Sequence, residues 1–141
     1  MFRFLISALL VVFLIVPTSA QSITPQDQTA FQAIIAAQLD AFKKDDGAAA
    51  YSYAAPVVQG LFPDAEKFMT MVKHGYEPIF KNTKHSFGQV VDDGLGHPNQ
   101  HVIITTSDGK RYEAVYVMQQ QPDGSWKIAG VQMVEIPTTD A

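Results

Sequence analysis

Two Asp-Gly pairs divide the apolar second half of this chain into segments of strand length, and they constrain its fold more than any other feature. The pairs are Asp108-Gly109 and Asp123-Gly124, and runs rich in Val, Ile and Tyr flank both. An Asp-Gly pair between such runs is a strong signal for a β-hairpin, because the tight turn needs the positive φ that these residues tolerate. A further strand is expected over residues 85–91. The second half is therefore predicted to form an antiparallel meander of about four strands.

The first turn predicts which residues of its two strands face each other. A two-residue turn at Asp108-Gly109 places Ser107 opposite Lys110. Counting outward along both strands then places His101 opposite Tyr116. The sequence thus predicts that this histidine and this tyrosine lie side by side on one face of the sheet.

The second turn, residues 122–125, extends the register by placing Tyr116 opposite Val131 and Val115 opposite Gln132. Because successive side chains alternate across a sheet, the two registers sort the strands into two faces. One predicted face collects Val102, Ile104, Val115, Val117, Trp126, Ile128 and Gln132. The other collects His101, Ile103, Thr105, Tyr112, Ala114, Tyr116, Met118, Val131 and Met133. Both faces are too apolar for a sheet that exposes one face to water.

The first half of the chain carries the pattern of helices. Thr24 and Pro25 are the residue types that favour an N-cap and a first helical position. Apolar residues then recur on one helical stripe: Phe31, Ile34, Ile35, Leu39 and Phe42. The segment from Lys43 to Gly47 is predicted to end this helix, since lysines are favoured at a helix C-terminus.

Two shorter helices are expected before the strands. One covers residues 48–54, and the next begins after a cap at Asp64 and ends at Gly75. Residues 60–63 are predicted to form a turn, and residues 76–78 an extended connection. The predicted fold class is α+β, with three N-terminal helices packed on a curved, mainly antiparallel sheet. Since these helices can cover only one face, a second copy is expected to cover the other, which gives a homodimer through a sheet face.

Residues 1–20 have the order of a secretory signal peptide: a basic Arg3, an apolar run from Phe4 to Val16, and small residues up to Ala20. The apolar run is shorter than the ~20 residues that a membrane-spanning helix needs. Cleavage near Ala20 would leave one domain, residues 21–141, with no membrane attachment. The chain has no cysteine, which is compatible with export to a bacterial periplasm and excludes thiolate catalysis and cysteine-type zinc sites.

The charge of the chain argues against a polyanionic partner. The formal net charge is −4, and loss of Arg3 with the signal peptide would make the mature domain more acidic. Nucleic acid and anionic membrane surfaces are therefore not expected to bind.

Several motifs resemble a known fold. The pattern Phe31-x(10)-Phe42-x(4)-Gly47-x(3)-Tyr51, followed by a final Asp-Gly-Ser-Trp-Lys-Ile strand at residues 123–128, resembles the nuclear-transport-factor-2-like cone. This resemblance implies a curved sheet that wraps a long helix and leaves a pocket at its open end. Further segments are similar to a family of short bacterial proteins of unknown function: residues 38–42, 46–51, 54–56, 61–63, 68–69 and 75–78. Cone-fold proteins include isomerases, dehydratases, hydrolases and non-catalytic binders, so the fold does not choose among them.

The acidic residues do not predict a catalytic site. Asp40, Asp45 and Asp46 lie off the apolar stripe or at the helix end, and Asp64 is explained as a cap. Glu113 lies near a hairpin turn, where exposure is expected. The carboxylate base of ketosteroid isomerase, a cone-fold enzyme, has no counterpart at any position here. No catalytic residue is therefore assigned.

The histidines are candidates for metal ligands and for proton carriers. His97 and His101 lie close in sequence to Asp92 and Asp93, but the intervening glycines and proline are the composition of an ordinary loop. No metal site and no cofactor is assigned. His101 is of more interest, because the predicted register places it beside Tyr116 either as a structural pair or as part of a pocket.

The remaining candidates are aromatic and amide side chains that would line the mouth of a cone. An apolar ligand with a few hydrogen bonds would suit such a mouth, although core and rim packing would explain the same residues. The candidate pocket residues are Tyr51, Gln59, Tyr76, His101, Tyr116 and Gln132.

Three functions remain open from the sequence. The first is a periplasmic binder of a small apolar or amphipathic molecule. The second is a structural or protein-interaction module of the cell envelope. The third is an enzyme of the isomerase, dehydratase or hydrolase kind, and the absence of a carboxylate candidate argues against it.

Overall fold

The computed structural model describes residues 22–138. The predicted signal peptide and its cleavage point lie outside the described residues. Among the helices that are described, none is long and apolar enough to cross a membrane.

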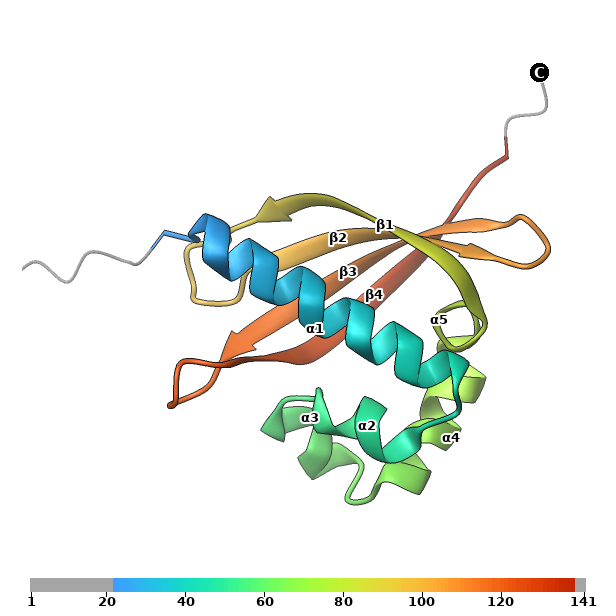
Figure 1. The fold of residues 1–141 in the computed structure, drawn as a ribbon, viewed down its shortest axis with the longest axis horizontal. Coiled ribbons are helices and arrows are strands. Elements are labelled where there is room, and N and C mark those ends of the chain that lie inside the picture. The colour runs from blue at the N-terminus through green and yellow to red at the C-terminus, as the bar shows by residue number, and fades with distance from the viewer. Residues whose placement is uncertain (1–21, 139–141) are drawn as a thin grey trace, which may run out of the picture.

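Helix α1, Pro25–Lys43, lies across one face of the sheet and is the longest helix in Figure 1. The predicted cap at Thr24 is confirmed: its hydroxyl accepts from the Asp27 N–H at 3.1 Å, and the Asp27 carboxylate accepts from the Thr24 N–H at 2.9 Å. This reciprocal pair satisfies two N–H groups that the helix itself leaves unbonded. The helix ends at Lys43, within the segment expected to end it.

The sheet has four strands in the order β1-β2-β3-β4: β1 Asn82–Val91, β2 Asn99–Thr106, β3 Arg111–Gln120 and β4 Trp126–Ile136. All neighbouring strands are antiparallel. The α+β class and the four-stranded meander are therefore confirmed. In Figure 1 the sheet curves around α1 but stays open, so it does not form the closed barrel that a cone-like α+β barrel would need.

The first hairpin turn is one residue longer than predicted. Thr106 accepts from the Gly109 N–H and donates to the Lys110 carbonyl, both at 3.0 Å, so the loop contains the three residues 107–109. Of these only Gly109 has a positive φ, 82°. This is the geometry of a three-residue loop whose last residue forms a bulge, and it shifts the register by one position relative to a two-residue turn.

The predicted pairing of His101 with Tyr116 is therefore wrong. His101 lies opposite Val115, and Gln100 lies opposite Tyr116. A one-residue shift moves every side chain of a strand to the other face of the sheet. Accordingly, the two predicted faces exchange their β2 members.

The observed inner face, which α1 covers, is buried. It carries Gln100, Val102, Ile104, Ala114, Tyr116, Met118 and Ile128. The outer face carries His101, Ile103, Glu113, Val115, Val117, Gln132 and Val134. The inner face is thus the core, and it joins the aliphatic residues of β2 to the tyrosine and methionine of β3.

The second hairpin has the predicted pairs Tyr116–Val131 and Val115–Gln132, and these are confirmed. They arise through a bulge. Next to the turn Met118 pairs with Ile128, and the register then shifts so that Val117 pairs with Gly130. The extra residue on β4 bends this edge strand.

Within residues 22–138, five helices precede the sheet rather than the predicted three. The additional ones are α3, Pro56–Leu61, and α5, Glu77–Phe80. Both contain a proline near their start, where the fixed φ of proline suits a helix and its missing N–H costs nothing. Residues 60–61 of the predicted turn and residues 77–78 of the predicted extended connection are therefore helical. The other two short helices are α2, Gly47–Ser52, and α4, Ala65–Gly75.

The segment between α2 and α3 is joined to the free edge of β4. Ile128 donates to the Tyr53 carbonyl at 2.9 Å and accepts from the Ala55 N–H at 2.8 Å. Ala54 forms an isolated parallel bridge with the same isoleucine. This short junction fixes the cluster of α2, α3 and α4, which lies below α1 in Figure 1, against the sheet.

Candidate functional site

A cavity of about 380 Å³ lies between the short helices, the C-terminal half of α1 and the β3–β4 hairpin. This volume is within the range of small-molecule sites, roughly 300–1,000 Å³. The lining residues include aliphatic and aromatic side chains from α1, α3, α4 and α5, and none of the lining residues is charged. Those used below are Gln38, Val58, Leu61, Phe62, Met71, Tyr76, Tyr116, Ala129, Gly130 and Val131.

Tyr116 forms part of the cavity wall contributed by the sheet. It is fully buried, and its hydroxyl group has no hydrogen-bond partner. Burial raises the pKa of the phenol above its usual range, so the hydroxyl stays protonated at neutral pH. Leaving a buried hydroxyl unpaired costs about 1–3 kcal/mol. The hydroxyl oxygen is itself buried, so it is not in reach of the open part of the cavity.

Gln38 contributes a polar side chain from α1. It is 3% exposed, and its Nε2 donates to the Ala50 carbonyl at 3.1 Å, which fixes the amide against α2. Sequence reasoning did not select Gln38. The signal was present, because this residue follows Ile35 by three positions and precedes Phe42 by four, which places it on the buried stripe.

The β4 bulge forms the opposite part of the wall. Ala129 is the residue left without a partner between the pairs of Gly130 and Ile128, and Ala129, Gly130 and Val131 all line the cavity. Bulges are common beside functional sites because they redirect the strand locally. Here Ile128, the residue of β4 that is joined to Ala54, lines the cavity as well, so the bulge and this junction form one continuous part of the wall.

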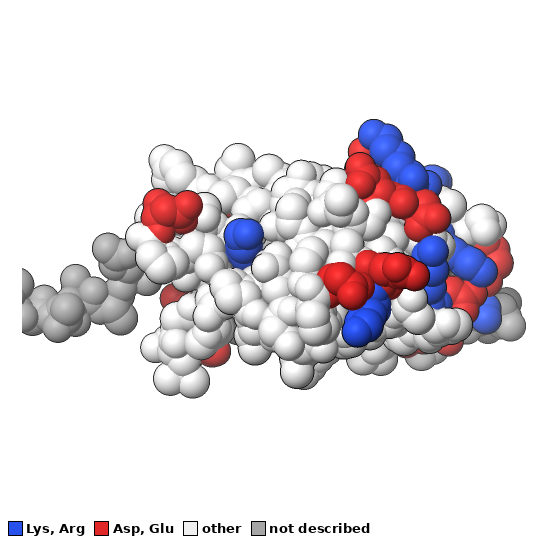
Figure 2. Space-filling model, turned by 90° about the horizontal axis from the view of Figure 1, so that it is seen from below, with Lys and Arg blue, Asp and Glu red and all other residues white. Residues whose placement is uncertain are grey.

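The cavity opens to solvent beside α3. Leu61 lines it and is nevertheless 71% exposed, while Val58, Phe62 and Met71 are partly exposed. Figure 2 shows the molecule from the side on which α2, α3 and α4 lie in Figure 1. Basic and acidic side chains intermix toward one end of this view, and the rest is mostly uncharged.

The structure separates the six candidate pocket residues into three groups. Tyr76 and Tyr116 line the cavity. Tyr51 and Gln59 do not line the cavity but support the helices that do. The Tyr51 hydroxyl donates to the Phe62 carbonyl at 2.6 Å, and Gln59 Nε2 donates to the Tyr51 carbonyl at 3.1 Å. These two bonds hold α2 against α3.

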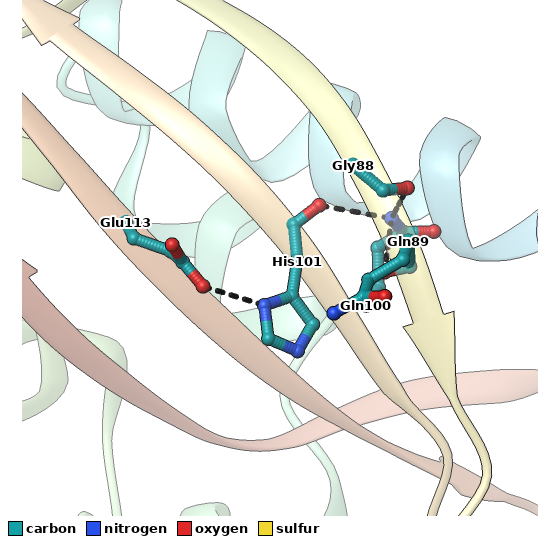
Figure 3. A network of polar contacts seen from close by, with 5 residues as sticks. All are labelled: Gly88, Gln89, Gln100, His101 and Glu113. Atoms are coloured by element: carbon teal, nitrogen blue, oxygen red, sulfur yellow. Dashed lines mark hydrogen bonds and ion pairs between the residues drawn. The ribbon is translucent and has the colours of Figure 1, made fainter.

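His101 and Gln132 form the third group and lie on the outer face of the sheet. His101 Nδ1 is 2.7 Å from the Glu113 Oε1 of the neighbouring strand, as Figure 3 shows. Gln132 is exposed and pairs with Val115 on the same face. The register shift described above turns His101 away from the cavity. Gln132 has the predicted partner, Val115, and lies on the outer face because Val115 does.

Gln100 replaces His101 as the inner neighbour of Tyr116. Its Nε2 donates to the carbonyls of His101 at 2.9 Å and Gly88 at 3.1 Å (Figure 3). Gly88 lies in the irregular stretch of β1 where the register shifts. The buried amide thus satisfies a carbonyl of that bulge, a structural role.

The acidic residues take the local roles that the sequence predicted. Asp46 and Asp64 cap α2 and α4 by accepting from the N–H groups of Ala49 and Lys67. Asp40 pairs with Lys44 at 2.8 Å on the surface, and this bond lowers the pKa of the carboxyl. In the part of the chain that the structure describes, no group of three or more His, Asp or Glu side chains is placed to hold a metal ion.

Comparison with known proteins gives a family but no characterised relative. No curated protein and no solved structure matched the sequence. A family model matches residues 24–141, which covers all five helices and the sheet. The chain therefore belongs to the family described as Domain of unknown function (DUF4864).

Proposed function

We propose that this protein binds a small apolar or amphipathic molecule without transforming it. The observation that carries the proposal is the cavity of about 380 Å³, whose lining has no charged residue and includes the amide of Gln38, which the Ala50 carbonyl holds in place. Apolar walls with a few fixed polar groups are typical of small-molecule sites. The lining offers no carboxylate, imidazole or lysine to act as a general base, which favours binding over catalysis.

The proposal is tested by titrating the mature domain with N-phenyl-1-naphthylamine, a neutral dye whose fluorescence rises in apolar surroundings. We expect saturable binding. Val131 lies beside Tyr116 on the cavity wall, so Val131→Phe would place a ring in the cavity and weaken dye binding by roughly tenfold or more, equivalent to about 1.4 kcal/mol.

Val134→Phe is the matched control. Val134 lies on the same strand but on the outer face, and it is 69% exposed. Dye affinity should be unchanged in this variant. Equal loss in both variants, or no saturable binding by the unmodified domain, would contradict a ligand site in the cavity.

We further propose that the protein acts after export to a bacterial periplasm. The support is the signal-like order of residues 1–20 and the absence of cysteine from the chain. Intact-mass measurement of the protein recovered from a periplasmic fraction should give a chain that begins at Gln21. Recovery of the full-length chain from the cytoplasm alone would contradict this proposal.

A further inference from the structure

We infer that the ligand is an apolar molecule with a hydroxyl group that donates a hydrogen bond to the side-chain oxygen of Gln38 inside the cavity. This inference rests on the proposed function and adds to it the chemical class of the ligand. It favours alcohols over ethers, ketones and hydrocarbons of the same size. It also assigns to Gln38 the role of the polar group that orients the ligand.

The orientation of the Gln38 amide follows from its bond to α2. Its Nε2 donates to the Ala50 carbonyl at 3.1 Å. If the amide were turned over, its oxygen would face the Ala50 oxygen, and two acceptors would lie together without a proton between them. The NH2 end must therefore face α2, and the Gln38 oxygen is directed away from Ala50.

The Gln38 oxygen borders open space although the residue as a whole is only 3% exposed. Among the described residues, the side-chain atoms that are both fully buried and without a partner are Asn82 Oδ1, Gln100 Oε1 and Tyr116 Oη. Gln38 Oε1 is not one of them, although no described residue donates to it. The oxygen is therefore accessible, and the open space that Gln38 lines is the cavity.

An accessible amide oxygen in the cavity selects for a ligand that has a donor. Water can donate to this oxygen in the free protein, and a ligand that fills the cavity displaces that water. A ligand that does not replace the lost hydrogen bond loses affinity. An amide oxygen has lone pairs and no proton to give, so an ether or ketone oxygen cannot bond to it, whereas a hydroxyl group can.

The hydroxyl group must belong to the part of the ligand that enters the cavity. Gln38 is 3% exposed and its amide is bonded to α2, whereas Leu61 at the mouth is 71% exposed. A group that stays in the solvent outside the mouth does not reach the amide. The requirement for a buried donor therefore holds whether or not another part of the ligand, at the mouth, carries a charge.

The test compares two isomers, 1-nonanol and methyl octyl ether, as competitors for bound N-phenyl-1-naphthylamine. The two molecules contain the same atoms, but only the alcohol has an O–H donor. We expect the alcohol to displace the dye at a concentration about fivefold lower, the effect of one neutral hydrogen bond of about 1 kcal/mol. A wall without an accessible acceptor would favour the ether, because the alcohol would lose its hydrogen bonds to water without replacement. Equal potency, or stronger displacement by the ether, would overturn this inference while leaving a dye-binding cavity in place.

Gln38→Met tests the assigned residue, because methionine has a similar length and shape but no amide. The ratio of the two displacing concentrations is compared within each variant, so that any change in the affinity for the dye cancels. In Gln38→Met the preference for the alcohol should disappear. A retained preference would overturn the role of Gln38.

Gln59→Met is the matched control. Gln59 Nε2 also donates to a helix carbonyl, that of Tyr51, at 3.1 Å, but Gln59 does not line the cavity. This variant should keep the preference for the alcohol, and loss of the preference in both variants would contradict a specific role of Gln38. The comparison of the isomers on the unmodified protein needs no variant, so it decides the ligand class even if Gln38→Met does not fold. Failure of the dye and of both isomers to bind the unmodified protein would overturn the proposed function together with this inference.

Discussion

Tyr116 is unusual among the core residues because its ring packs in the core while its hydroxyl has no partner. In the absence of ligand this group should lower the stability of the fold. We therefore expect Tyr116→Phe to raise the free energy of unfolding by about 1 kcal/mol, since the change removes an unsatisfied buried hydroxyl and keeps the ring. Urea denaturation of ligand-free protein measures this difference, and a loss of stability of similar size would show that the hydroxyl is already bonded within the fold.

His85 offers a prediction about pH. Partial burial, followed by the nearby charge of Lys43, holds the pKa of its imidazole below the usual 6.5. The unfolded chain therefore binds a proton more readily than the folded protein between these two pKa values. The free energy of unfolding should consequently fall as the pH is lowered through this window.

NMR titration of the His85 ring protons should give a midpoint below 6.5. His85→Gln should reduce the fall in stability over the same interval, because glutamine has no proton to gain. A midpoint at or above the usual value would contradict the account of this side chain.

The sequence predicted individual residues correctly where their role depends on their own segment. It failed where the role depends on which residues of two strands face each other. The caps at Thr24 and Asp64 follow from their own segments. Tyr116 was selected partly through a pairing with His101 that does not exist. Gln38 was not selected, although its position on the apolar stripe indicated the burial that the structure shows.

At the scale of elements, the hairpins were predictable and one register was not. An Asp-Gly pair fits both a two-residue turn and the end of a three-residue loop, and the two choices differ by one position. Alternation of apolar and polar residues along a strand would normally decide between the two registers. Here both faces of the sheet are rich in apolar residues, so either register buries apolar side chains. The short helices α3 and α5 were missed because their prolines were taken as breaks rather than as first-turn residues.

The three-residue loop makes Gly109 essential to the first hairpin. With φ at 82°, it occupies the left-handed region, where an L side chain costs roughly 1–2 kcal/mol. Gly109→Ala should therefore lower the free energy of unfolding by about 1 kcal/mol or more in urea denaturation.

Gly60 is the matched control for this change. It lies within α3 at an ordinary φ, and an added Cβ would meet no atom within 4 Å. Gly60→Ala should raise stability by about 0.5–1 kcal/mol, because alanine loses less backbone entropy than glycine in a helix. If both substitutions changed stability equally, the assigned loop geometry would be wrong.

At the scale of the whole molecule, none of the helices that the structure describes covers the outer face of the sheet. It carries Ile103, Val115, Val117 and the largely exposed Val134. We propose that a second copy covers this face, and we expect a dimer in light scattering at micromolar concentration. Val115→Glu, at the centre of the face, should give a folded monomer, whereas Val115→Thr should remain dimeric. A monomeric unmodified protein at high concentration would contradict the proposal.

The cavity itself could not be predicted from the sequence in detail. It depends on where the α2–α3 segment joins the edge of β4 and on the bulge that follows, and both are fixed by contacts between distant parts of the chain. The sequence indicated the α+β class, the meander and the presence of pocket-forming aromatics. It could not show that His101 would be excluded from the cavity, because a single shifted register decided that outcome.

Native mass spectrometry of residues 21–141, purified from a bacterial periplasm and incubated with excess N-phenyl-1-naphthylamine, tests the central claim most directly. The account predicts protein ions that carry the mass of a bound small molecule, lose it on denaturation, and are depleted by Val131→Phe but not by Val134→Phe. Ions at the bare protein mass under these conditions would contradict the claim that the cavity between α1, the short helices and β4 is a ligand site.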